Sequence, residues 1–177
     1  MPEIAIGPSR VTIEPGALDT LGARVRDAAA AHRYAVISDE TVAALHGARV
    51  LASLADAGLR AELLAFPAGE AHKTRETWGA MTDRMLAAGF GRDSVVVALG
   101  GGVVGDLAGF CAACFQRGIP VVQAPTTIVS QVDSAYGGKT GVDLPEGKNY
   151  AGAYHQPAMV LADPATLTTL PAEEAAA

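Results

Sequence analysis

A glycine-rich stretch that follows an apolar run carries the clearest chemistry in this sequence. Gly100, Gly102 and Gly105 have the G-x-G-x-x-G spacing, directly after the β-branched run of residues 94–99. This spacing lets a strand turn sharply into a helix, brings backbone N–H groups close to a pyrophosphate and directs the positive helix end at it. The usual fingerprint also has an acidic residue roughly 20 positions further on, where this chain has Gln123. Two interpretations stay open: a dinucleotide site, or a tight turn without a ligand.

Polar side chains also follow three other apolar runs. Asp39 ends one run, Glu70 and Lys73 follow a second, and Thr126 and Thr127 follow a third. Loops at the carboxyl ends of parallel strands are where open α/β sheets bind ligands. A carboxylate in the position of Asp39 suits a ribose hydroxyl, although it suits the N-cap of the next helix equally well.

Three further patterns bear on packing and on function. Cys111 and Cys114 form a C-x-x-C, which is typical of redox or zinc sites, but their place in an apolar helical pattern favours packing. Residues 130–149 are polar and rich in glycine, and we expect them to form a long functional loop. An apolar stripe on the helix before the glycine-rich stretch is expected to lie in the core, namely Trp78, Met81, Met85 and Leu86.

These residues need elements that position them, and the chain alternates short apolar runs with helical patterns. We expect strands over residues 4–6, 11–13, 34–39, 61–66, 94–99, 120–124 and 158–162, and helices over 17–31, 40–46, 50–57, 77–88 and 104–116. The first two strands flank Gly7-Pro8 and are expected to form a hairpin. The alternation predicts one α/β domain with a mostly parallel sheet.

Composition excludes several classes of protein. The chain has 177 residues, is half hydrophobic and has a formal net charge of −6, which argues against nucleic acid as a partner. No apolar run reaches the roughly 18 residues of a membrane span, and Met1–Ile6 does not start a secretory signal. We therefore expect a cytoplasmic protein without a membrane partner.

Taken together, the motifs resemble the amino-terminal half of the 3-dehydroquinate synthase family. The resemblance covers essentially the whole chain, and its segments are Gly69-Glu70 with Lys73, the residues 100–106 with Gly109-Phe110, Arg117-Gly118, the residues 125–127 with 130–134, the residues 137–142, Gly147-Lys148-Asn149, Gln156-Pro157 and Leu170-Pro171. Members of the family bind NAD on a Rossmann-like α/β domain. They hold a divalent metal, zinc or cobalt, on a helical carboxyl-terminal domain.

The resemblance implies a reaction of the shikimate pathway. NAD oxidises the C5 alcohol of a phosphorylated sugar acid, 3-deoxy-D-arabino-heptulosonate 7-phosphate, so that phosphate is eliminated. Return of the hydride, ring opening and an aldol step then yield 3-dehydroquinate. The net reaction is that of a phosphorus–oxygen lyase.

The resemblance also implies roles for individual residues. The implied cofactor-binding set is Asp39, Glu70, Lys73, Gly101, Gly102, Val103, Val104, Gly105, Asp106, Thr126, Thr127, Lys139 and Lys148. The implied substrate-side, catalytic set is Asp133, Lys139, Lys148, Asn149 and Arg117. Arg117 is implied to reach the substrate phosphate of a neighbouring subunit, so a homodimer is expected.

Two positions depart from the family pattern, and the metal ligands are not found. Asp143 stands where the family usually has Asn, which adds negative charge beside an anionic substrate unless the side chain turns away, and Glu173 stands where it usually has Arg. We expect residues 1–171 to form the NAD-binding domain and residues 172–177 to lead toward the helical domain, which is absent. The chain alone is then expected to bind no metal and to be inactive, unless a separate carboxyl-terminal domain joins it.

Two other functions remain open from sequence. The chain could be a non-catalytic binding or assembly module of the same fold. It could also be the corresponding domain of another sugar-phosphate cyclase or of a polyol dehydrogenase.

Overall fold

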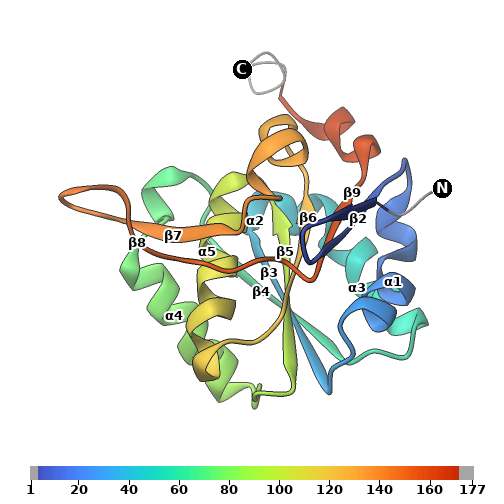
Figure 1. Ribbon diagram of the computed structural model, residues 1–177, viewed down its shortest axis with the longest axis horizontal. Helices are drawn as coiled ribbons and strands as arrows, with labels where there is room; N and C mark the ends of the chain where they lie inside the picture. The colour runs from blue at the N-terminus through green and yellow to red at the C-terminus, as the bar shows by residue number, and fades with distance from the viewer. Residues whose placement is uncertain (1–3, 172–177) are drawn as a thin grey trace.

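A seven-stranded sheet forms the middle layer of the molecule, as the computed structural model shows for residues 4–171 (Figure 1). Six strands are parallel, and only β1 runs antiparallel, as the outer strand of the amino-terminal hairpin. In spatial order they are β1 (Ile4–Ile6), β2 (Ser9–Ile13), β9 (Met159–Ala162), β6 (Val121–Pro125), β5 (Ser94–Gly100), β3 (Arg33–Asp39) and β4 (Ala61–Phe66). The expected Rossmann-like α/β fold, hairpin included, is confirmed.

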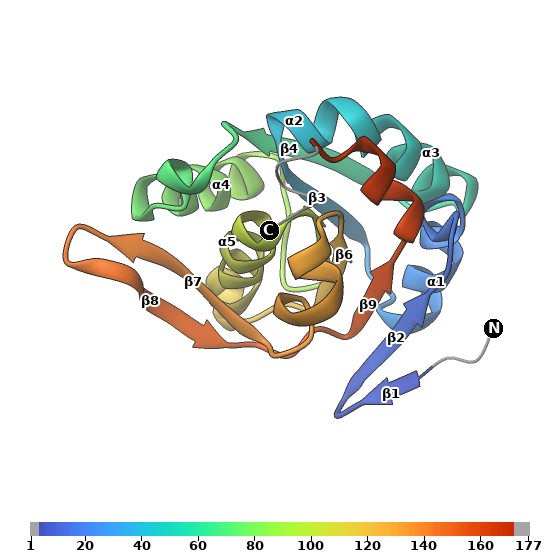
Figure 2. The same ribbon diagram turned by 90° about the horizontal axis from the view of Figure 1, so that it is seen from above.

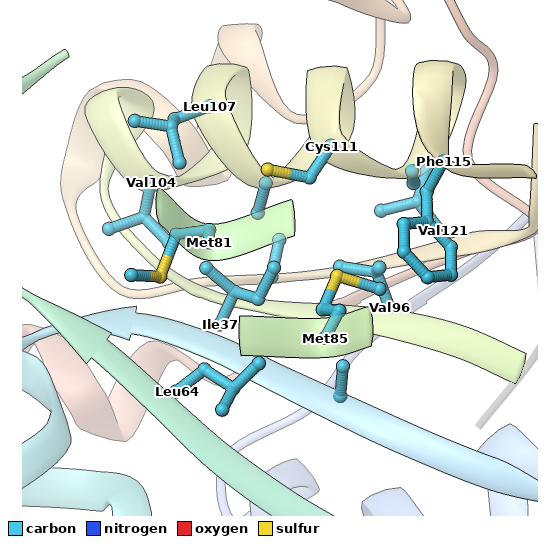
Figure 3. Close-up of a cluster of buried hydrophobic side chains, with 14 of the residues drawn as sticks. Ile37, Leu64, Met81, Met85, Val96, Val104, Leu107, Cys111, Phe115 and Val121 are labelled. Carbon is cyan, nitrogen blue, oxygen red and sulfur yellow. The ribbon is translucent and has the colours of Figure 1, made fainter. Parts of the chain in front are cut away.

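Helices cover both faces of this sheet (Figure 2). On one face α1 (Leu21–Ala28) and α3 (Ala48–Asp56) pack on the strands, and on the other face α4 (Arg75–Ala87) and α5 (Gly102–Cys114) do so. Every residue of β5 is buried, which explains its continuous apolar sequence. Figure 3 shows Met81 and Met85 of α4 and Cys111 of α5 meeting above the strands.

The crossovers diverge between β3 and β5. The chain leaves β3 through α2 (Glu40–Val42) and α3 on one face, whereas it leaves β5 through α5 on the other. Such a switch point opens a crevice at the carboxyl ends of the two strands, where open α/β sheets bind ligands. Asp39 and the glycine-rich turn border this crevice.

The expected long loop over residues 130–149 is wrong in its second half. A one-turn π-helix spans Ser130–Ser134, and then β7 (Lys139–Leu144) pairs antiparallel with β8 (Gly147–Tyr154). The hairpin is held against α5, because a Cβ on Gly109 would lie 2.5 Å from Thr140 Cγ2. Glycines that suggested a loop instead allow close packing: a Cβ on Gly152 would lie 2.2 Å from the Thr140 carbonyl oxygen.

Two packing expectations and one expected helix boundary are only partly right. Cys111 is buried, and burial raises the pKa of its thiol, but Cys114 is exposed one turn later. Leu86 is exposed as well, because α4 turns that flank of its stripe to solvent. The first helix begins with a 3-10 turn at Ala17–Thr20 and ends at Ala28.

A buried polar cluster joins the two ends of the described chain, and we call it the Asp163 cluster (Asp163, Arg49 and Gln131). The fully buried Asp163 carboxylate accepts hydrogen bonds from the backbone N–H groups of Gly16 at 2.8 Å and Leu18 at 3.2 Å, and pairs with Arg49 at 3.3 Å. Gln131 donates to the Asp163 carbonyl oxygen at 3.0 Å. Sequence reasoning missed this cluster.

No helix among residues 4–171 combines the length and the apolar character that a membrane crossing requires.

Candidate functional site

In the glycine-rich turn between β5 and α5, packing requires two of the glycines but not the third. A Cβ on Gly100 would lie 2.5 Å from Val104 Cγ2, and one on Gly101 would lie 2.9 Å from Thr127 Cγ2. A Cβ on Gly102 would meet only Ser134 Oγ, at an ordinary 3.5 Å. The fold therefore leaves space at Gly102, the first residue of α5, where free backbone N–H groups favour an anion.

The next strand end adds a hydroxyl without a partner. Thr126 donates its backbone N–H to the Gly100 carbonyl oxygen at 3.0 Å, which fixes it beside the turn. Its Oγ1 is buried and has no hydrogen-bond partner among the described residues, an arrangement that ordinarily calls for a ligand or water. Thr127 instead shares a hydrogen bond with Ser130 at 2.8 Å and starts the following turn.

The other predicted residues of the turn contribute differently. The side chain of Val104 is fully buried in the core, and Val103 is packed against the same core. A Cβ on Gly105 would lie 3.0 Å from Gln123 Oε1, so this glycine is needed for helix–strand packing. Any ligand contact from Val104 must therefore come from its backbone.

Asp39 lies across the crevice from the glycine-rich turn. Its Oδ1 accepts from the backbone N–H of Val42 at 2.9 Å, so Asp39 caps α2. Its neighbour Ser38 donates to the Leu99 carbonyl oxygen at 2.7 Å and ties β3 to β5. The cap uses only Asp39 Oδ1, so capping and ligand binding are compatible.

A buried cation lies beneath this edge of the sheet, in what we call the Lys73 cluster (Lys73, Asp106 and Asn149). Only 4% of the Lys73 side chain is exposed, and its Nζ donates to Asp106 Oδ2 at 2.5 Å and to Asn149 Oδ1 at 2.6 Å. The three residues come from the loop after β4, from α5 and from β8. The cluster thus joins three segments that are far apart in sequence.

Burial has the largest effect on the pKa of Asp106 in this cluster. It raises the pKa of the Asp106 carboxyl, an effect that the hydrogen bond and charge of Lys73 oppose and the charges of Glu70 and Asp143 reinforce. A pKa perturbed by burial and specific partners in a crevice is typical of functional sites.

Glu70 and Lys148 form a second, exposed pair above the first. Lys148 Nζ lies 3.1 Å from Glu70 Oε1, and the Lys148 side chain is 72% exposed. A pair so exposed contributes little to stability. Both side chains are free to turn toward a ligand.

A hollow of about 440 Å³ opens beside the Lys73 cluster. Three of the predicted substrate-side residues, Asp133, Lys139 and Asn149, line it together with Asp106. Asp133 lies in the π-helical turn, a feature that occurs frequently at functional sites. Sequence reasoning missed Ser134, Tyr150 and Tyr154, which also line the hollow.

Arg117 lies away from all of these residues. It follows the carboxyl end of α5, about 20 Å along the helix from Gly102. Gln116 and Arg117 both have left-handed backbone, with φ of 51° and 69°, which is a strained conformation for such residues. Arg117 is not among the residues that line the hollow of its own chain.

No group of three or more His, Cys, Asp or Glu side chains suited to a metal ion occurs within residues 4–171. Glu173 lies outside the described residues.

Comparisons with known proteins agree with this geometry. The family model described as 3-dehydroquinate synthase N-terminal matches residues 63–177. The chain is 51% identical over 164 residues to a 3-dehydroquinate synthase of Pelobacter propionicus, covering 93% of this chain and 46% of the relative. It is 51% identical over 167 residues to that of Caulobacter vibrioides, covering 94% and 45%. The chain thus spans about half the length of these curated relatives.

Solved structures with the same fold belong to related enzymes. A 2-deoxy-scyllo-inosose synthase complexed with carbaglucose-6-phosphate, NAD+ and Co2+ superposes with a TM-score of 0.86 at 30% identity, covering 94% of this chain and 46% of that one. A 2-epi-5-epi-valiolone synthase from Streptomyces hygroscopicus subsp. jinggangensis with NAD+ and Zn2+ has a TM-score of 0.83 at 34% identity, covering 98% and 47%.

Proposed function

The chain belongs to the 3-dehydroquinate synthase family, and on that premise we propose that its residues 1–171 form the NAD-binding domain of such an enzyme. One observation carries the proposal: the fold leaves space at Gly102, at the amino end of α5, beside the unpartnered hydroxyl of Thr126. A pyrophosphate needs backbone N–H groups and close approach, and both are available there.

The remaining residues fit a dinucleotide extended along the crevice. Asp39 would accept from a ribose hydroxyl, as carboxylates at this place in open sheets do. Glu70, Lys73, Lys148 and Thr127 border the same edge, and Asp106 anchors Lys73. When bound, NAD would supply a hydride acceptor and donor.

The hollow suits the phosphorylated sugar acid that this family converts to 3-dehydroquinate. Lys139 would pair with its anionic groups, and Asp133 and Asn149 would bond to its hydroxyls, because charged and amide groups orient such a polyol. Arg117 would serve the hollow of a second copy, so the proposal includes a homodimer. We place this reaction in the shikimate pathway of the cytoplasm.

A second hollow suits the other half of such an enzyme. Exposed Ile13 and Val132 line it with Val11 and Tyr136, and Asp133 lines both hollows. We propose that the helical domain of the family, which would carry the zinc or cobalt ion, covers this apolar surface and faces the substrate. The same surface would serve the alternative role of a binding or assembly module.

The test of NAD binding is calorimetric titration of the chain and of two matched variants. We expect NAD to bind the chain with millimolar or tighter affinity, and Gly102→Ala to weaken binding about tenfold because its methyl group occupies the ligand's space. Gly79→Ala is the control, since a Cβ there meets nothing within 4 Å and lies on α4, away from the crevice. Equal affinity of both variants, with unchanged melting temperatures, contradicts the proposed site.

Turnover tests the second half of the proposal. We expect the chain alone to release no phosphate from the sugar acid, and release to appear when a separately produced carboxyl-terminal domain of a relative is added with zinc and NAD. Steady release of phosphate by the chain alone would show that turnover does not require the carboxyl-terminal domain. Binding without release in the mixture would favour the assembly module.

A further inference from the structure

The β7–β8 hairpin contains an irregularity where Asp143 faces three residues. Val142 pairs with Ala151 and Leu144 pairs with Gly147, so Asp143 alone lies opposite residues 148–150. The middle residue, Asn149, has left-handed backbone with φ of 58°. Bulges of this kind redirect a side chain and are frequent beside active sites.

Asp143 supplies the partner that this bulge needs. Its Oδ1 accepts from the backbone N–H of Asn149 at 2.8 Å. Its own backbone N–H donates to the Lys73 carbonyl oxygen at 2.8 Å, and Asp143 forms an isolated parallel bridge with Thr74. One residue thus holds both the bulge and the segment that carries Lys73.

We infer that Asp143 is a positioning residue of the candidate site. It holds Asn149 in the left-handed conformation, in which Asn149 Oδ1 accepts from Lys73 Nζ and the residue lines the substrate hollow. The carboxylate of Asp143 is not among the groups that line the hollow. The unusual acid is therefore turned toward the bulge, which answers the concern that it opposes an anionic substrate.

The acceptor atom, rather than the charge, is what this role requires. An amide in the place of Asp143 can still present an oxygen to the Asn149 N–H, whereas a methyl group cannot. The formal charges around it are Lys73 and Lys148 against Glu70, Asp106 and Asp143. Loss of one negative charge leaves this group balanced, so a purely electrostatic role predicts a different result from Asp143→Asn.

The positioning is tested by amide hydrogen exchange of the 15N-labelled chain. In Asp143→Ala we expect the Asn149 amide to exchange at least about tenfold faster and the Lys73 ammonium signal to shift, because the bulge loses its acceptor. Asp143→Asn should remain within about threefold of the unchanged chain. Glu146→Ala is the matched control, because Glu146 is an exposed carboxylate on the same hairpin turn.

Several outcomes would overturn the inference. Wild-type exchange at Asn149 in Asp143→Ala shows that the carboxylate holds nothing. Equal effects of Ala and Asn show that charge, not the acceptor, matters. If Asp143→Ala does not fold, Asp143→Ser and Asp143→Asn test the same bond, because both keep an oxygen that can accept from the Asn149 N–H. Wild-type exchange of the Asn149 amide in at least one of them supports the inference, and faster exchange in both refutes it.

The consequence for the cofactor rests on the proposed function, and a separate titration measures it. We expect NAD to bind Asp143→Ala about tenfold more weakly, and Asp143→Asn and Glu146→Ala nearly as well as the unchanged chain. If the unchanged chain binds no NAD, the proposed function fails while the exchange data still decide the role of Asp143. Unchanged NAD affinity beside faster Asn149 exchange would restrict that role to the hairpin.

Discussion

The Asp163 cluster and the Lys73 cluster each contain a buried charged side chain, but the two clusters are satisfied in different ways. Asp163 is fully buried, and its carboxylate accepts from three backbone N–H groups in addition to Arg49. Asp106 keeps 22% of its side chain exposed beside a hollow, and among the described residues its carboxylate pairs with the Lys73 ammonium. The Asp163 carboxylate thus uses its hydrogen-bonding capacity within the chain, whereas the Asp106 carboxylate keeps part of its capacity available for a ligand.

We interpret this difference as one between a cluster that stabilises the fold and a cluster that binds a ligand. A carboxylate bonded to several backbone N–H groups fixes the segments that contribute them, here the turn before α1 and the segment after β9. A buried ion pair with few partners costs desolvation that the fold alone does not recover in full. We therefore expect the Asp163 cluster to dominate stability and the Lys73 cluster to dominate ligand affinity.

The largest effect is expected from Asp163→Asn. The new amide places an N–H donor against backbone donors and Arg49, so the free energy of unfolding should fall by about 3 kcal/mol. For a chain of this size that lowers the melting temperature by roughly 6–12 °C. Thermal denaturation followed by circular dichroism measures the change.

Asp19→Asn is the control for this variant, because Asp19 pairs with the same Arg49 from a side chain that is 61% exposed. An exposed pair should contribute less than about 0.5 kcal/mol. Comparable losses from both variants would assign the stability to Arg49 rather than to the buried carboxylate. A loss of NAD affinity in folded Asp163→Asn would break the separation of the two clusters.

The strands were predictable from sequence, because burial on both faces of a parallel sheet demands continuous apolar runs such as residues 94–99. The β7–β8 hairpin was not predictable, because Gly141 and Gly152 resemble loop residues until a partner strand is placed beside them. Side-chain exposure near helix ends was equally hidden: Cys111 and Cys114 differ by one helical turn, yet only the first faces the sheet.

From the sequence, the candidate site could be predicted only from the polar residues at strand ends and from the resemblance to a known family. Spacing placed Asp39, Glu70 and Thr126 at one edge, since carboxyl ends of parallel strands meet there. The contact of Lys73 with Asn149 joins residues 76 positions apart, and no local pattern encodes it. Asp163 left one signal, an Asp-Pro before a helical turn that it caps, but its partners near Gly16 depend on the tertiary fold.

A smaller effect on stability, with a distinct pH dependence, is expected from Lys73→Met. The free energy of unfolding should fall by about 1–2 kcal/mol near neutral pH, because Asp106 loses its cation. Burial already raises the pKa of Asp106, and loss of Lys73 raises it further, so the folded protein takes up a proton where the unfolded chain does not. The deficit is therefore full near neutral pH and shrinks as the pH falls through the folded-state pKa of Asp106.

Urea denaturation at several pH values measures this deficit, and a double-mutant cycle with Asp106→Asn isolates its cause. The double variant should recover part of the stability near neutral pH, since it removes the unpaired charge, but it should not recover NAD affinity, since the Asn149 side chain has lost its donor. A deficit that stays constant with pH would show that packing of the Lys73 stem, rather than its charge, supports Asp106. Full NAD affinity in the double variant would show that the Lys73 cluster, like the Asp163 cluster, stabilises the fold and does not support NAD binding.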